Sequence, residues 1–87
     1  MNKVLKTIVY HLLNQHYIGA KHTPERRLIR SKTKWINRYE FKEFMKEYKY
    51  FINRGTILRM KKKTGKGMDW HISLNPRTLD ELYEMIE

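Results

Sequence analysis

Basic side chains gather without a single acid in the stretch from Arg59 to Lys66. The five in this stretch are Arg59, Lys61, Lys62, Lys63 and Lys66. Like charges repel, so folding gives no reason to collect them, whereas a polyanion such as nucleic acid does. Lysine on an exposed hairpin also discourages edge-to-edge aggregation, which leaves a solubilising loop as the alternative. The stretch therefore indicates either phosphate contacts or a solubilising surface.

The remaining charge is also uneven, within a formal net charge of +10. Residues 21–38 hold seven Lys or Arg side chains against Glu25 alone, whereas the last ten residues carry four acids and no base. A second basic segment and an acidic end indicate a molecule with one cationic side. Such a charge distribution favours a polyanionic partner.

The side chains that carry most enzyme chemistry are missing or scattered. The chain has no cysteine, hence no thiolate nucleophile and no disulfide. No two histidines stand three or four residues apart, the spacing of a helical metal site. The four histidines are His11, His16, His22 and His71. Asp69 has no partner carboxylate for two-metal chemistry, and we expect it to pair with Lys66 or His71 or to end a turn. We expect no enzyme, no cofactor and no metal.

Length and hydropathy predict a single domain, residues 1–87. The N-terminal segment has periodic apolar residues and no cleavage-like site, which is unlike a signal peptide. No apolar run approaches the roughly 20 residues of a membrane span. We therefore expect a cytoplasmic protein with no membrane partner.

Apolar side chains recur at helical spacing in four segments. The predicted helices cover residues 3–15, 24–30, 38–54 and a short segment after residue 78. Three capping signals are expected to set helix starts. These signals are Thr23 before Pro24 and the capping-box pairs Asn37–Glu40 and Thr78–Glu81. Gly19 and Gly55 are expected to close the first and third helices.

Residues 56–60 and 68–74 are predicted as the strands of a hairpin, with residues 61–67 at its tip. Four apolar residues of the second strand alternate with polar ones and should form a buried face. They are Met68, Trp70, Ile72 and Leu74. We also expect Trp35 in the core and a short extended piece at residues 18–22.

The third predicted helix has one apolar stripe and a mixed outer surface. The stripe consists of Phe41, Phe44, Met45, Tyr48, Phe51 and Ile52. Lysines follow one flank and glutamates the other, with Glu43 within reach of Lys46, while Tyr39 and Tyr50 point outward. Such a surface fits either a helix that approaches DNA end-on or an ordinary core helix with a solvated face.

The order helix, helix, helix, hairpin, helix resembles the winged helix-turn-helix family over nearly the whole chain. The strings His22-Thr23-Pro24-Glu25 and Trp70-His71-Ile72-Ser73-Leu74-Asn75-Pro76 also resemble small archaeal winged-helix proteins. The resemblance implies an α+β, mainly α, fold with a three-helix core, a hairpin wing and a short C-terminal helix. It makes Arg38–Arg54 the recognition helix and residues 61–67 the wing tip. The connector at residues 31–36 departs from the pattern, because it is longer than a tight turn.

From this resemblance we expect a DNA-binding transcriptional or architectural regulator associated with the nucleoid, docking by electrostatics with limited base readout. Phosphate contacts are expected at Arg26, Arg27, Arg30, Lys32, Lys34, Arg59, Lys61, Lys62, Lys63 and Lys66. Residues expected to face the major groove are Arg38, Tyr39, Lys42, Lys46 and Lys49.

Two alternatives stay open. Charge does not separate DNA from structured RNA, because both supply phosphates, although we favour DNA. Winged helices also serve as protein-interaction modules. The apolar stripe of the first helix is expected in the core unless it pairs with a second copy in a homodimer.

Overall fold

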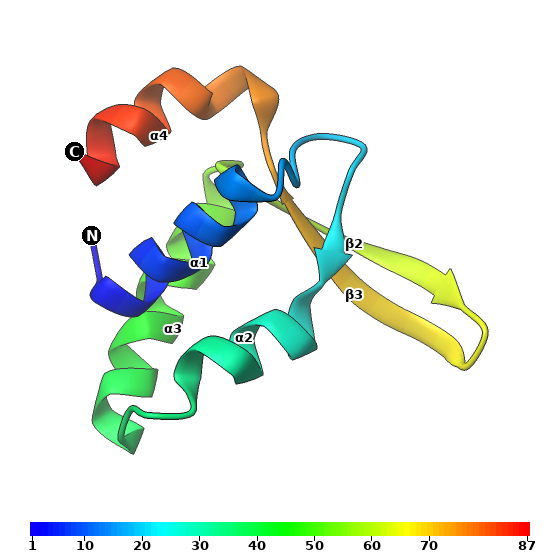
Figure 1. Cartoon of the computed structure of the whole chain (residues 1–87), viewed down its shortest axis with the longest axis horizontal. Helices are drawn as coiled ribbons and strands as arrows, with labels where there is room; N and C mark the ends of the chain where they lie inside the picture. Colours follow the sequence, from blue (N-terminus) through cyan, green and yellow to red (C-terminus); the bar gives the residue numbers. More distant parts are fainter.

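The computed structural model describes residues 1–87 and arranges them as four helices and a three-stranded antiparallel sheet (Figure 1). The helices are α1 (Lys3–Asn14), α2 (Glu25–Thr33), α3 (Arg38–Asn53) and α4 (Leu79–Ile86), with a 3-10 turn η1 (Pro76–Thr78) before α4. The strands are β1 (Thr23–Pro24), β2 (Ile57–Thr64) and β3 (Gly67–Leu74), in the sheet order β1-β3-β2. This α+β layout is compatible with a winged helix. None of the helices combines the length and the apolar character needed to span a membrane.

The capping box predicted for the third helix is confirmed. The Glu40 amide donates to the Asn37 side chain at 2.8 Å, and the Asn37 amide donates to the Glu40 carboxylate at 3.3 Å. An unforeseen cap starts α1, where the Asn2 side chain accepts from the amides of Val4 and Leu5. Both caps satisfy amides that have no partner within the helix.

The caps expected from the two threonines are wrong. Thr23 pairs with Ile72 as part of β1, so α2 begins at Glu25 without a side-chain cap. Thr78 donates its hydroxyl to the Asn75 carbonyl at 3.2 Å, and α4 likewise has no side-chain cap. In both places the threonine makes a different interaction. Thr23 belongs to the edge strand β1, and the Thr78 hydroxyl bonds within the η1 turn.

The first helix ends earlier than Gly19. His16 adopts the left-handed conformation with φ 58, the His16 amide bonds to the Leu13 carbonyl, and the Tyr17 amide bonds to the Leu12 carbonyl. These two bonds form a Schellman motif. Gly19 has a different task, since its amide reaches the Leu74 carbonyl at 2.9 Å and ties the loop to β3. The short extended piece expected at residues 18–22 is thus reduced to a single bridge at Ile18, and β1 lies just beyond it.

The connector between the second and third helices is a tight turn. α2 continues through Thr33, which leaves only residues 34–37 before α3. Ser31 and Thr33 fit the last turn of α2 because their hydroxyls donate back to the carbonyls of Leu28 and Ile29. The expected long connector at residues 31–36 is therefore wrong, and the departure from the family pattern disappears.

The lysines expected at the tip of the hairpin lie mostly in a strand. β2 and β3 pair over their whole length, from Ile57 opposite Leu74 to Thr64 opposite Gly67. Residues 65–66 alone form the turn, and Gly67 takes φ 122, a conformation that favours glycine. The lysine run therefore belongs to β2 rather than to a loop.

Thirteen apolar side chains from all four helices and the two long strands form one core. They are Leu5, Ile8, Val9, Leu12, Leu28, Phe44, Tyr48, Phe51, Ile57, Ile72, Leu74, Leu82 and Ile86. The far half of the hairpin projects beyond this core, away from both chain ends (Figure 1). The core therefore holds only the base of the hairpin.

Several aromatic residues expected inside are outside. Trp35 is 88% exposed, so its predicted place in the core is wrong. Phe41 is also exposed, because the buried stripe of α3 centres on Phe44, Tyr48 and Phe51. Trp35 instead lies in the turn at residues 34–37, outside the packed faces of the helices.

We expect the Asn37→Ala variant to lose about 1 kcal/mol of unfolding free energy, because the Glu40 amide at the start of α3 loses its side-chain acceptor. Urea denaturation followed by circular dichroism measures this loss. Asn14→Ala is the matched control, since Asn14 is exposed at the end of α1. Equal stability of the two variants would show that the cap contributes nothing.

Candidate nucleic-acid interface

The lysines of β2 alternate between the two faces of the hairpin, because successive side chains of a strand point to opposite sides. Lys62 stands opposite Asp69, on the same face as His71. The reverse face carries the cross-strand pairs Lys61–Trp70 and Lys63–Met68. A single lysine of the run therefore shares a face with His71, and Lys66 lies in the turn.

A basic cleft lies between α2 and the face of the hairpin that carries His71. Its volume is about 550 Å³. It is lined by Pro24, Arg26, Arg27, Arg30, Ser31 and Lys34 on one side and by Thr64, Asp69 and His71 on the other. Apart from Pro24 every lining residue is polar or charged. The lining contains four cationic side chains and one carboxylate. We call this feature the basic cleft.

The spacing of α2 explains why its cations converge. The four residues Arg26, Arg27, Arg30 and Lys34 share one side of the helix. Leu28 is buried on the other side, against the core. Lys32 also turns to that inner side, where it is half-buried. Desolvation lowers the pKa of His11, and the charge of Lys32 lowers it further. Of the five basic residues at positions 26–34 that were expected to contact phosphates, four line the basic cleft and Lys32 does not.

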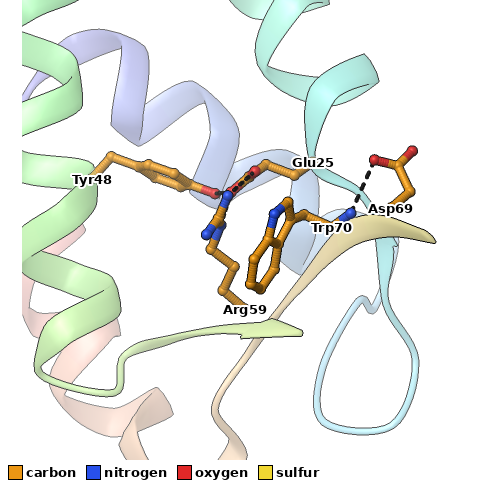
Figure 2. Close-up of polar contacts among 5 residues, drawn as sticks. All are labelled: Glu25, Tyr48, Arg59, Asp69 and Trp70. Atoms are coloured by element: carbon orange, nitrogen blue, oxygen red, sulfur yellow. Dashed lines mark hydrogen bonds and ion pairs between the residues drawn. The ribbon is translucent and has the colours of Figure 1, made fainter. Parts of the chain in front are cut away.

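A cluster of polar contacts joins the base of the hairpin to two helices (Figure 2). Arg59 binds Glu25 with two charge-assisted hydrogen bonds, from Nε at 2.7 Å and from Nη2 at 2.9 Å. The Tyr48 hydroxyl donates to the same carboxylate at 2.6 Å. The Glu25 side chain is only 12% exposed and that of Arg59 is 32% exposed, so the carboxylate end of the contact is largely buried. We call Glu25, Tyr48 and Arg59 the polar node; it joins α2, α3 and β2.

The polar node changes the expected roles of Arg59 and Trp70. The Arg59 guanidinium is held by Glu25 and lies 3.8 Å from the centre of the Trp70 ring. The hydrogen bond to Glu25 raises the pKa of Arg59, and burial with the Glu25 bond raises that of Tyr48. We therefore leave Arg59 out of the proposed phosphate contacts. Trp70 is 36% exposed, so its expected burial is wrong, and Met68 on the same face is more exposed still.

Two histidines that lie far apart in the sequence meet beside the basic cleft. Nδ1 of His22 and Nδ1 of His71 are 2.8 Å apart, and the two rings meet edge to face. Desolvation lowers the pKa of His22 below its usual 6.5, and the charges of His71 and Lys62 lower it further. Helical spacing could not reveal this pair, because the pairing of β1 with β3 creates it.

Asp69 forms none of the three ion pairs of the structure. The expected pairing of Asp69 with Lys66 or His71 is wrong. The Asp69 carboxylate accepts a hydrogen bond from the Trp70 amide at 2.9 Å instead. Figure 2 shows this carboxylate directed away from the polar node. No three His, Asp or Glu side chains come together as ligands for a metal.

The residues expected to face the major groove lie on the exposed surface of α3 rather than in the basic cleft. They are Arg38, Tyr39, Lys42, Lys46 and Lys49. Tyr39 is 70% exposed, and the predicted pair of Lys46 with Glu43 is confirmed at 3.5 Å. Lys49 borders a groove of about 290 Å³ on the other side of α2, which Ile29 and Met45 also line. The structure therefore separates this set from the cations of α2.

Comparison of the chain with protein-family models, with curated proteins and with solved structures gave no match.

Replacing Arg59 with Met should lower the free energy of unfolding by about 1–3 kcal/mol, because the Glu25 carboxylate loses its charged partner while remaining largely buried. Lys63→Met is the matched control, on the same face of β2 but exposed, and should change stability by less than about 0.5 kcal/mol. Urea denaturation of both variants makes the comparison. An Arg59→Met variant as stable as the control would contradict the role given to the polar node.

Proposed function

We propose that this protein is a winged-helix protein that binds the backbone of duplex nucleic acid, DNA in preference to RNA. The observation that carries the proposal is the basic cleft, where three arginines of α2 and the adjoining Lys34 face a polar wall of the hairpin. Cations held close together on a rigid helix repel one another, and a polyanion relieves that repulsion.

The length of the basic row on α2 suits a run of phosphates. Arg26, Arg30 and Lys34 follow one another every four residues, which spreads them over roughly 12 Å of helix axis. One strand of DNA carries about one phosphate per 3.4 Å of axis, so the row spans the length of roughly three to four phosphates. Two successive contacts by the row would fix the register of the protein on the strand.

The composition of the basic cleft favours a duplex over a single strand. Single-stranded nucleic acid is usually held by stacking its bases on aromatic rings. The cleft has no Phe, Tyr or Trp side chain, and Trp70 lies on the reverse face with Arg59 stacked on its ring. A cleft of this composition recognises phosphates and leaves the bases paired.

The arrangement also agrees with how helix-turn-helix proteins dock. In them the first helix of the motif crosses the backbone and the second enters the major groove. We propose that α2 takes the first role and that α3 takes the second, with Arg38 and Tyr39 at its exposed start. Lys62 and the turn residue Lys66 then contact neighbouring phosphates. The protein would act as a transcriptional or architectural regulator, bound mainly through the backbone.

The double variant Arg27→Ala/Arg30→Ala tests this proposal through the salt dependence of binding. Each lost phosphate contact should reduce the slope of log K against log salt by about 0.9, so the double variant should lose about 2. Fluorescence anisotropy with a labelled DNA duplex over a salt series gives the slope.

The matched control is Lys3→Ala/Arg77→Ala, which removes the same charge from exposed sites on α1 and η1. An equal loss of slope in both double variants would mean that only net charge matters. The same series with an RNA duplex decides between the two nucleic acids, and tighter binding of RNA would replace the preference for DNA.

A second candidate function is a protein-interaction module, which the exposed aromatic residues of the α2–α3 turn and the first turns of α3 favour. The side chains of Trp35 and Tyr39, four residues apart in the sequence, are exposed to solvent, and that of Phe41 is also exposed. Large exposed aromatic residues commonly mark interaction sites. This candidate is supported if the chain fails to bind any duplex at near-physiological salt while co-purifying with a protein partner.

A further inference from the structure

The geometry points to proton uptake at the His22–His71 pair: we propose that one proton binds this pair when nucleic acid occupies the basic cleft, so that binding strengthens as pH falls. This inference rests on the proposed function and adds a form of regulation to the same site. It starts from the position of His71, which lines the basic cleft, and from its 2.8 Å contact with His22.

The pair can accept one proton without losing its hydrogen bond. With both rings neutral, one Nδ1 carries the hydrogen and donates it to the Nδ1 of the other. A first added proton turns one ring into an imidazolium, which donates to the neutral ring in a stronger, charge-assisted bond. A second proton would set two N–H groups against each other at the same distance. The capacity of the pair is therefore one proton.

The charges around the pair disfavour an added positive charge in the free protein. Lys62 of β2 shares the face of His71. The cations of α2 line the same cleft, and the Asp69 carboxylate of β3 is the only acid among them. β1 contributes the uncharged Thr23 and Pro24. Cations outnumber the acid, so an added positive charge is unfavourable while the cleft is empty.

Phosphates in the basic cleft reverse this balance. A polyanion near His71 neutralises the surrounding cations and favours the imidazolium, which raises the affinity of the pair for a proton. By linkage, a complex that holds one more proton than the free protein binds more tightly as pH falls. Between about pH 7.5 and about pH 5.5 histidine is the side chain that ordinarily titrates, so carboxylates do not obscure the effect.

The test is fluorescence anisotropy of a DNA duplex at constant salt across this pH range. We expect the association constant of the unaltered chain to rise by roughly three- to tenfold over the range. The double variant His22→Gln/His71→Gln should remove that rise. The control variant His16→Gln changes an exposed histidine at the end of α1 and should keep it. A rise that persists in the double variant, or that is absent from the unaltered chain, overturns the proposal.

A measurement on the unaltered chain covers the case in which the double variant does not fold. NMR titration of the histidine rings, with and without duplex, reports their pKa values directly. A rise in the pKa of His22 or His71 on binding supports the proposal, and unchanged values overturn it. If instead the proposed function is wrong, the chain binds no duplex at any pH, which distinguishes that outcome from failure of the histidine proposal.

Discussion

The bidentate contact of Arg59 with Glu25 is the constraint on which the rest of the site depends. Glu25 is the first residue of α2, and its carboxylate is shared by Arg59 of β2 and Tyr48 of α3. The core holds only the base of the hairpin, so side chains at this level decide how the hairpin leans against the helices. The polar node thus sets the separation between the two walls of the basic cleft. Glu25 is also the single acid in a basic segment, and the structure uses it to organise cations rather than to neutralise them.

Strand pairing imposes the second constraint. Because the lysine run lies in β2, its side chains divide between two faces, and only Lys62 shares the face of His71. The cations that line the cleft come instead from the helical row that begins at Arg26 and ends at Lys34. The hairpin supplies the opposite wall, with Thr64, Asp69 and His71. A basic run that seemed to form one cluster contributes less to the cleft than the spaced arginines of α2.

Local signals in the sequence predicted much of the fold. The helices, the hairpin and the Asn37–Glu40 capping box follow from periodicity and from contacts three residues apart, which the sequence displays directly. The errors arose where distant segments decide the outcome. Thr23 became part of a sheet edge, Arg59 found a partner 34 residues away, and the two paired histidines are 49 residues apart. The place of Trp35 could not be foreseen either, because it depends on how the α2–α3 turn folds.

NMR titration of the ¹⁵N-labelled chain with a DNA duplex decides whether nucleic acid occupies the space between α2 and the hairpin. We expect the largest shifts of backbone amide signals on residues 26–34, on the start of α3 at Arg38 and Tyr39, and on the part of the hairpin that carries Lys62 and His71. Shifts confined to α1 and α4, with those three segments unchanged, would contradict it.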